Sequence, residues 1–162
     1  MASKIYWLHQ FENGARIGIA ARPRGGEWLK DEILYLHKNK VNVLVSLLEH
    51  NEIYELELEL EEQECTLQNM KYINFPIADR AVPEKNLKTD YFIDSLVKGI
   101  NNGLSIIIHC RMGIGRSSII AAAVLLKFNF DTRNIFEMIS KTRGLNVPDT
   151  EEQIQWVLVR GK

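Results

Sequence analysis

SIIIHCRMGIGRSS (residues 105–118) is the stretch that decides the fold of this chain. It completes an apolar run, Leu104 to Ile108, whose three successive isoleucines are typical of a buried strand. The residues that follow it, up to Phe128, are apolar almost all round, as expected for a central helix. Between the two, Gly113 and Gly115 allow a tight turn. The stretch therefore predicts a strand, a compact loop and a central helix in direct succession.

Strand-like and helix-like runs alternate along the rest of the chain. We expect strands at 16–20, 41–48, 71–75 and 104–108, and helices at 28–38, 51–68, 89–101, 116–128, 132–143 and from Thr150 onward. This alternation predicts an α/β fold with a central, mostly parallel sheet and helices on both of its faces. Because 162 residues are the size of one domain, we expect a single domain over residues 1–162.

Residues 51–68 fit two kinds of secondary structure. The run LELELE alternates as a strand does, whereas Ile53, Leu56, Leu60 and Leu67 keep helical spacing. Since Glu, Leu and Gln are good helix formers, we expect a helix here. The acidic residues of this segment indicate a solvated face rather than a docking site.

The composition is that of an ordinary globular protein. Apolar residues make up 46% and charged residues 25% of the chain, and the net charge is −1. This balance gives no sign of a nucleic-acid or membrane surface. No apolar run is long enough to span a membrane, and the first residues lack the pattern of a signal peptide. We therefore expect a cytoplasmic monomer that binds neither nucleic acid nor membrane.

The two cysteines, Cys65 and Cys110, are too few for a disulfide framework and wrongly spaced for a zinc knuckle. This favours a reducing compartment. His9, His37 and His50 are dispersed along the chain and predict no metal site. We expect the protein to use no metal and no other cofactor.

The loop after the isoleucines lies where open α/β sheets bind ligands, beyond the carboxyl end of a strand. A helix that begins near Arg116 offers unpaired amides and the positive end of its dipole, which suit an anion. The guanidinium of Arg116 can fork onto two oxygens of a phosphate or sulfate. In this positive potential the thiolate form of Cys110 is favoured. The residues themselves thus indicate a nucleophilic cysteine beneath an oxyanion cradle.

His109, Cys110, Gly113, Arg116 and Ser117 match the pattern HCxxGxxR[ST]. In this pattern the chain resembles the cysteine-dependent protein tyrosine phosphatases. The segments FPIADRAVP and RGLNVPDTEEQ are similar to the dual-specificity branch, in particular to the cyclin-dependent-kinase-associated phosphatase and its small bacterial relatives. The resemblance covers residues 40–160. It implies a phosphotyrosine-phosphatase-like fold and one dual-specificity-phosphatase-like catalytic domain over residues 1–162.

The resemblance also implies roles for the residues of the loop. Cys110 would attack phosphorus and form a phosphocysteine, and Arg116 would bind the equatorial oxygens. Ser117 would hydrogen-bond the sulfur and help it leave, while His109 would support the thiolate from behind the loop. The cradle would be completed by the backbone amides of Arg111, Met112, Gly113, Ile114 and Gly115.

The leaving group needs an acid, and Asp79 in PIADR stands where the family places it. Negative charge on the thiolate and the phosphate would keep this carboxyl protonated in the complex. The alternative for Asp79 is an Asx turn. Asp90 and Asp94 compete for the role, but they lie on a predicted helix and resemble nothing catalytic.

Four further positions stay open between a functional and a structural role. Arg80 would steer anionic substrates or form a loop salt bridge. Gln153 would orient the hydrolytic water, or it would form a capping box with Thr150. The basic loop 22–26 would be a plain turn or part of the substrate rim. Cys65 would be a small buried helix residue, or it would form a protective disulfide with Cys110.

These observations predict a metal-independent phosphatase that hydrolyses phosphotyrosine, and also phosphoserine or phosphothreonine, in a protein or peptide. The alternatives are a phosphoinositide or RNA phosphatase and an inactive phosphopeptide binder. Met112 and Ile114 replace the lysines that lipid phosphatases carry in this loop, and the intact Cys110, Arg116 and Asp79 disfavour the inactive binder. A rhodanese-type sulfurtransferase has a shorter loop and no counterpart of PIADR.

Overall fold

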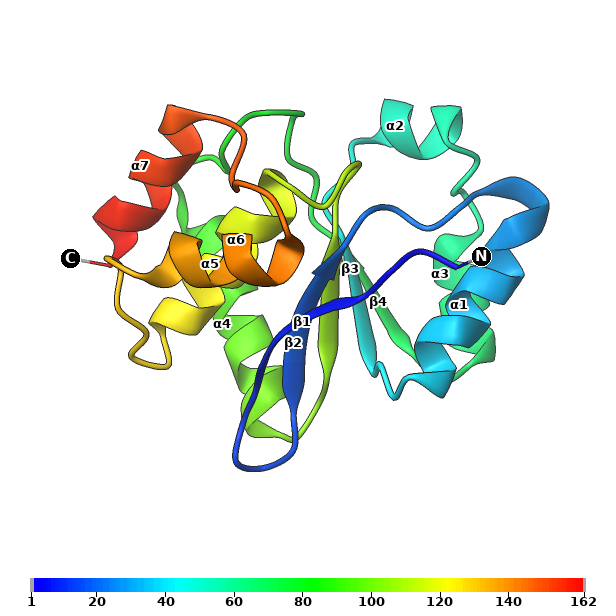
Figure 1. Cartoon of the computed structure of the whole chain (residues 1–162). Helices are drawn as coiled ribbons and strands as arrows, with labels where there is room; N and C mark the ends of the chain where they lie inside the picture. The colour runs from blue at the N-terminus through cyan, green and yellow to red at the C-terminus, as the bar shows by residue number, and fades with distance from the viewer. Residues whose placement is uncertain (1, 162) are drawn as a thin grey trace.

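A five-stranded sheet in the order β1-β2-β5-β3-β4 runs through the centre of the molecule (Figure 1). The computed structural model describes residues 2–161. The strands are β1 (Tyr6–Gln10), β2 (Arg16–Ala20), β3 (Val43–Ser46), β4 (Lys71–Asn74) and β5 (Ile106–His109). The β2–β5, β5–β3 and β3–β4 pairs are parallel, whereas β1 is antiparallel to β2. The predicted α/β fold with a mostly parallel sheet is confirmed.

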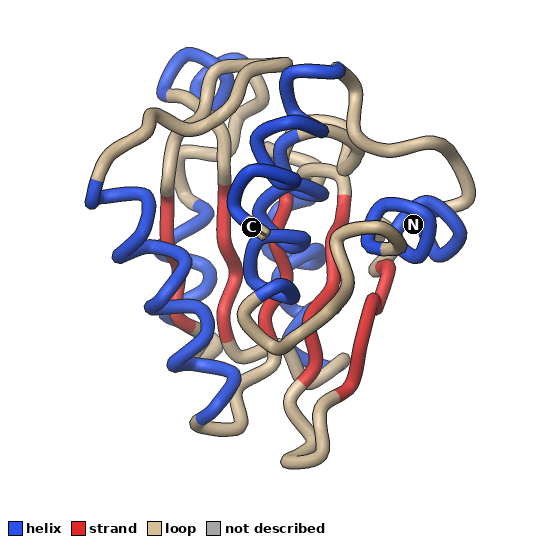
Figure 2. The backbone as a smooth tube through the Cα atoms, turned by 90° about the vertical axis from the view of Figure 1, so that its left-hand side faces the viewer, coloured by secondary structure: helices blue, strands red, loops and turns tan. Residues whose placement is uncertain are grey.

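Residues 2–161 contain seven α-helices. They are α1 (Leu29–Lys38), α2 (His50–Glu55), α3 (Glu61–Leu67), α4 (Leu87–Asn101), α5 (Arg116–Leu126), α6 (Ile135–Arg143) and α7 (Glu151–Arg160). Six of them cover the two faces of the sheet, and α2 lies beyond the carboxyl ends of the strands (Figure 1). Figure 1 shows α1 and α3 on one side and α4 to α7 on the other, and the turned view of Figure 2 shows helices in front of the strands. None of the helices within residues 2–161 has the length and apolarity needed to cross a bilayer.

The isoleucines of β5 are buried on both faces, as expected for a central strand. Ile106 and Ile108 belong to the larger core cluster together with α4, α5 and α6, whereas Ile107 belongs to the smaller cluster beneath α1 and α3. This alternation follows from the two-residue period of a strand. Helix α5 packs in the larger core and is buried from Arg116 to Leu125, as predicted for a central helix.

Two expectations about secondary structure are wrong. No strand is expected at Tyr6–Gln10 from the sequence, but β1 lies there as an edge strand, and a bulge between Trp7 and His9 interrupts its alternation. The single helix expected over 51–68 is two short helices, α2 and α3. The chain breaks between them because Glu57 has a left-handed φ of 57° and Leu58 turns into the core with 1% of its surface exposed.

The parallel strands direct four loops to the same edge of the sheet. The segments that follow β2, β3, β4 and β5 are 21–25, 47–49, 75–86 and 110–115. Backbone hydrogen bonds join them: Arg22 N–H donates to Arg111 O, and Leu47 N–H donates to His109 O. The loop after β5 therefore lies in the middle of this edge, flanked by the loops of its neighbours.

Candidate active site

The loop 110–115 is shaped by its two glycines. Gly113 has a φ of +69°, and a Cβ at this residue would lie 2.7 Å from backbone atoms of Ala20 and Ala21. A Cβ on Gly115 would meet the ends of the Asp149 and Gln153 side chains, which would have to shift. Gly113 therefore requires glycine for its backbone conformation and its close approach to β2, whereas Gly115 leaves room for those two side chains. The loop is packed against β2 on one side and against the segment before α7 on the other.

Cys110 begins this loop and is buried, with 3% of its surface exposed. Its Sγ lies 3.3 Å from the hydroxyl of Ser117, which is itself fully buried in the first turn of α5. A hydroxyl can donate as well as accept, so Ser117 can stabilise either the thiol or the thiolate. The two residues that the sequence pairs by motif are therefore in direct contact.

Arg116 is the largest fully buried side chain, although it carries a charge. Its guanidinium forks onto the carboxylate of Glu52, with Nη1–Oε1 and Nη2–Oε2 distances of 2.7 and 2.9 Å. Nη1 also donates to Ile77 O at 2.9 Å. Burial lowers the pKa of Arg116, but the hydrogen bond to Glu52 and the charges of Cys110 and the carboxylates outweigh it and hold the pKa above its usual value. The guanidinium is thus a fixed, permanent cation.

Glu52 is a site residue that the sequence analysis missed. Burial raises its pKa, but the hydrogen bonds from Arg116 and the Glu49 backbone, with the charges of Arg116 and Arg111, lower it below the usual value. The only sequence signal is its spacing from Glu49, with which it forms a capping box at the start of α2. That signal indicates a helix start and says nothing of a contact with Arg116.

Asp79 lies on the loop between β4 and α4, where the sequence analysis places the acid. Its Oδ1 accepts a hydrogen bond from Arg116 Nη2 at 3.2 Å, while 60% of its side chain stays exposed. The competing aspartates face elsewhere on α4: Asp90 pairs with Arg160 and Asp94 pairs weakly with Lys127. Of the three carboxylates, only Asp79 contacts Arg116.

His109 is buried behind the loop, as expected, with a partner that the sequence does not indicate. Its Nε2 lies 2.6 Å from Oε2 of Glu61, and its Nδ1 lies 3.3 Å from the Cys110 carbonyl oxygen. Glu61 belongs to the acidic segment for which we expect a solvated face, but its exposure is 0%. For Glu52 and Glu61 that expectation is wrong, because both carboxylates turn inward. Glu52 pairs with the guanidinium of Arg116, and Glu61 with the imidazole of His109.

The side chain of Gln153 holds loops together. Its Oε1 accepts from the backbone N–H groups of Asp149 and Thr150, and its Nε2 donates to Ala81 O at 3.1 Å. The capping box with Thr150 is complete. All polar atoms of this buried amide are thus engaged, and the geometry favours the cap over the water-orienting role. Arg80 is 62% exposed and lies 4.0 Å from Asp149, a weak loop ion pair.

Cys65 and Cys110 lie in different core clusters and both are free thiols. Burial, and then the charges of Glu61 and its acidic neighbours on α3, raises the pKa of Cys65 to about 12. Such a thiol stays protonated and unreactive at neutral pH. The geometry therefore favours the structural role of Cys65.

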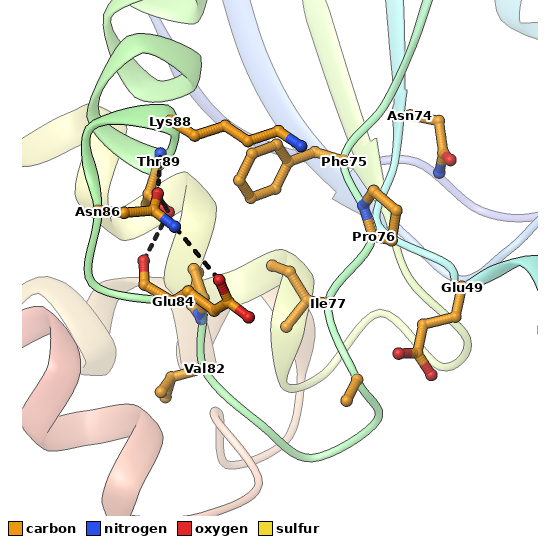
Figure 3. Close-up of a pocket in the computed structure, with 12 residues that line it drawn as sticks. Glu49, Asn74, Phe75, Pro76, Ile77, Val82, Glu84, Asn86, Lys88 and Thr89 are labelled. Atoms are coloured by element: carbon orange, nitrogen blue, oxygen red, sulfur yellow. Dashed lines mark hydrogen bonds between the residues drawn. The ribbon is translucent and has the colours of Figure 1, made fainter.

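A hollow of about 420 Å³ lies between the two limbs of the segment that carries Asp79 (Figure 3). Phe75, Ile77 and Val82 form its apolar wall, and Figure 3 shows the Lys88 side chain extending toward Phe75. Asn86 caps α4 at its edge by accepting from Thr89 N–H at 3.1 Å. The two limbs of this segment are therefore separated by a hollow that Asp79 itself does not line.

A family model described as "Polymorphic toxin system, DSP-PTPase phosphatase" matches residues 18–129, more than two thirds of the chain. Among solved structures, the kinase-associated phosphatase has a TM-score of 0.86 at 17% identity, over 97% of this chain and 93% of that one. Tk-PTP in its active form has a TM-score of 0.75 at 20% identity, over 96% and 95%. At identities this low, the two structural similarities establish the shared fold alone.

Over 58 residues the chain is 45% identical to protein 197R of Invertebrate iridescent virus 6, which is named as a tyrosine phosphatase. This covers 34% of the chain and 22% of that protein, so the chain matches about a fifth of the length of this curated relative. The family match contains the loop 110–115, Arg116 and Asp79. The chain belongs to the DSP-PTPase phosphatases of polymorphic toxin systems, a family of cysteine-dependent tyrosine and dual-specificity phosphatases.

Proposed function

We propose that the chain is one catalytic domain that hydrolyses phosphotyrosine, and also phosphoserine or phosphothreonine, in a protein or peptide. The observation that carries the proposal is the convergence of three groups on one loop. Cys110 contacts Ser117 in the first turn of α5, and the residue before Ser117, Arg116, donates a hydrogen bond to Asp79. A nucleophile, a cation for phosphate oxygens and an acid for the leaving group are the parts that phosphoryl transfer through an enzyme cysteine requires.

In the first step the Cys110 thiolate attacks phosphorus. The S–P bond forms, the P–O bond to the leaving group breaks, and Asp79 gives its proton to the departing oxygen. The guanidinium of Arg116, held in place by Glu52, offers its Nε–H and the Nη2–H that otherwise contacts Asp79 to two equatorial oxygens as negative charge spreads over them, while Asp79 turns to the leaving oxygen. Because Glu52 fixes the fork in advance, little reorganisation is needed when the ester binds.

In the second step water attacks the phosphocysteine. Asp79, now a carboxylate, takes a proton from the water, the new P–O bond forms and the P–S bond breaks. The sulfur leaves as a thiolate, to which the Ser117 hydroxyl donates a hydrogen bond from 3.3 Å. Phosphate and the free enzyme are the products, so each turnover consumes one water and no cofactor.

The side chains of the loop 110–115 support a protein substrate over a lipid one, because they offer few free positive charges. Met112 is 59% exposed, and Ile114 is partly buried against the larger core. The guanidinium of Arg111 is shared between Glu52 and Glu55 at 3.8 and 3.3 Å. A headgroup with several phosphates would need further cations here, whereas a single phosphate on an amino acid side chain would not.

A substrate panel tests this proposal. The wild-type chain should release phosphate from phosphotyrosine peptides, with phosphoserine and phosphothreonine peptides, a phosphoinositide and a 5′-phosphorylated RNA as comparisons. Turnover of the phosphopeptides supports the proposal. Turnover confined to the phosphoinositide or the RNA would replace it by one of those activities, and phosphopeptide binding without turnover would identify an inactive binder.

Replacing Asp79 by asparagine should slow the enzyme according to the leaving group. On phenyl phosphate, whose phenolate is a poor leaving group, we expect kcat/KM, which reports the first step alone, to fall about 10²-fold or more, and on p-nitrophenyl phosphate much less, because the better leaving group needs no proton. Steady-state rates on both esters measure the difference. Asp94→Asn, an exposed carboxylate of α4, is the matched control. Equal losses on the two esters would refute the acid role.

Chelators should leave the activity unchanged. The proposed steps place phosphate against Arg116 and loop amides, and the nucleophile is a thiolate, so no step needs a Lewis acid. Dialysis against EDTA followed by an aryl phosphatase assay makes the measurement, with a zinc-dependent phosphatase as the positive control. A loss that is restored by a divalent metal would contradict the mechanism.

A further inference from the structure

Glu61 and His109 form a buried pair directly behind Cys110. The His109 Nε2 and the Glu61 Oε2 are 2.6 Å apart, and 1% of each side chain is exposed. The other ring nitrogen, Nδ1, lies 3.3 Å from the Cys110 carbonyl oxygen. One imidazole therefore joins a carboxylate of α3 to the peptide of the nucleophilic residue.

The protons of this pair follow from the groups on either side of the ring. A carbonyl oxygen can only accept, so Nδ1 of His109 must carry a hydrogen and donate it to Cys110. The Nε2 and Glu61 Oε2 atoms then share one further proton. Their 2.6 Å separation is that of a strong hydrogen bond that contains this one proton. With Glu61 ionised, the ring beside Cys110 can hold a positive charge although it is buried.

The other titratable groups around the pair do not replace this carboxylate. Cys65 on α3 and Tyr72 on β4 have pKa values raised by burial first and by the charge of Glu61 second, so both are neutral near pH 7. Glu32 on α1 lines a small cavity together with His109, but it is ion-paired with Arg24 at 2.9 Å. Ser46 on β3 is uncharged. Within residues 2–161, His109 is the one ion-pair partner of Glu61.

Packing alone does not explain a carboxylate at this position. The second oxygen of Glu61, Oε1, is buried and has no hydrogen-bond partner among residues 2–161. A buried ion pair with an unsatisfied atom is commonly less stable than apolar side chains of the same volume. Besides Tyr72, whose hydroxyl also interacts with this carboxylate, the partner of Glu61 is His109, and this contact points to a use in the site.

We propose that Glu61 is a positioning residue that keeps His109 protonated, with its Nδ1–H toward Cys110, and thereby favours the thiolate. The proposal rests on Cys110 being the nucleophile and deepens the proposed function. Glu61 touches neither substrate nor reacting atoms, and it acts only through the ring. Without the carboxylate, the buried ring loses its counter-charge and becomes neutral. The thiolate then loses a nearby positive charge.

The pH dependence of Cys110 alkylation tests this proposal without using turnover. Iodoacetamide reacts with thiolates, and mass spectrometry of the peptide that contains Cys110 separates it from Cys65. In Glu61→Gln we expect the pH of half-maximal alkylation rate to rise by about one pH unit. Phosphatase activity below that pH should fall about tenfold and recover above it. Glu62→Gln, an exposed neighbour on the same helix, should change neither.

Two further variants keep the test decisive. Glu61→Asp retains the charge with a shorter side chain and should shift the profile by less than Glu61→Gln, and it serves alone if Glu61→Gln does not fold. In a His109→Gln background, Glu61→Gln should add no further shift, because its effect passes through the ring. An unmoved profile in the folded Glu61 variants, an equal shift in Glu62→Gln, or additive shifts with His109→Gln would overturn the proposal. A wild type without turnover refutes the phosphatase proposal but leaves the alkylation profile readable.

Discussion

Serine in place of Cys110 should abolish hydrolysis of every phosphate ester that the wild-type chain turns over. A serine hydroxyl is far less acidic than a thiol, and the amides and the guanidinium around this position cannot ionise it at neutral pH. We expect kcat for an aryl phosphate to fall about 10⁴-fold or more. The cradle itself stays intact, because Ser117 and Arg116 keep their partners. Inorganic phosphate should therefore still bind to the Cys110→Ser variant, with an affinity similar to that for the wild type.

Initial rates on p-nitrophenyl phosphate and calorimetric binding of inorganic phosphate measure the two effects separately. The matched control is Cys65→Ser, which removes the other buried thiol of the chain from the opposite core cluster. The control variant should keep its activity if it folds, as its thermal melting curve will show. Turnover that persists in the purified Cys110→Ser variant would place the nucleophile elsewhere.

Lysine in place of Arg116 should lower kcat about 10³-fold and change KM much less. An ammonium keeps the positive charge opposite Glu52 but cannot fork onto two oxygens, so the loss falls on the transition state, where charge spreads over the equatorial oxygens. Because the buried carboxylate retains a cation, the fold should survive better than with alanine. This separates a catalytic effect from an unfolding effect.

Steady-state kinetics of Arg116→Lys on the same aryl ester make the measurement. Arg133→Lys is the matched control, since Arg133 also forks onto a carboxylate, that of Asp131, but at an exposed site. It should leave both constants unchanged. A higher KM with an unchanged kcat in Arg116→Lys would show that the guanidinium serves ground-state binding alone.

The parts of the site that the sequence predicts are those that a local pattern encodes. His109 to Ser117 follow one another in a motif, and Asp79 stands in a short segment with its own signature, so both could be located before the fold was known. Glu52 and Glu61 could not, because they meet Arg116 and His109 across 64 and 48 residues of chain. The sequence around each of them, a run of acidic residues on a predicted helix, is typical of a solvated face.

The fold was predictable to a similar extent. Strands β2, β3 and β5 are largely apolar runs, and these three and the more polar β4 were each expected within a few residues of their bounds. The edge strand β1 mixes Trp7, His9 and Gln10 with a bulge, so its residues carry neither a clear two-residue period nor a buried run. Gln153 shows the converse case: its capping role was visible in the spacing from Thr150, and the structure uses the side chain in that way.

The break at Glu57 between α2 and α3 has a consequence for the electrostatics of the loop. In one uninterrupted helix, nine residues of separation would turn Glu61 about half a revolution away from Glu52, since each residue advances by about 100°. Only one of the two carboxylates could then face the site. The left-handed residue and the inward turn of Leu58 reset the helical phase, so one short segment supplies both carboxylates, one to the guanidinium of Arg116 and one to the imidazole of His109. A straight helix of the same composition would leave either the guanidinium or the imidazole without its carboxylate partner.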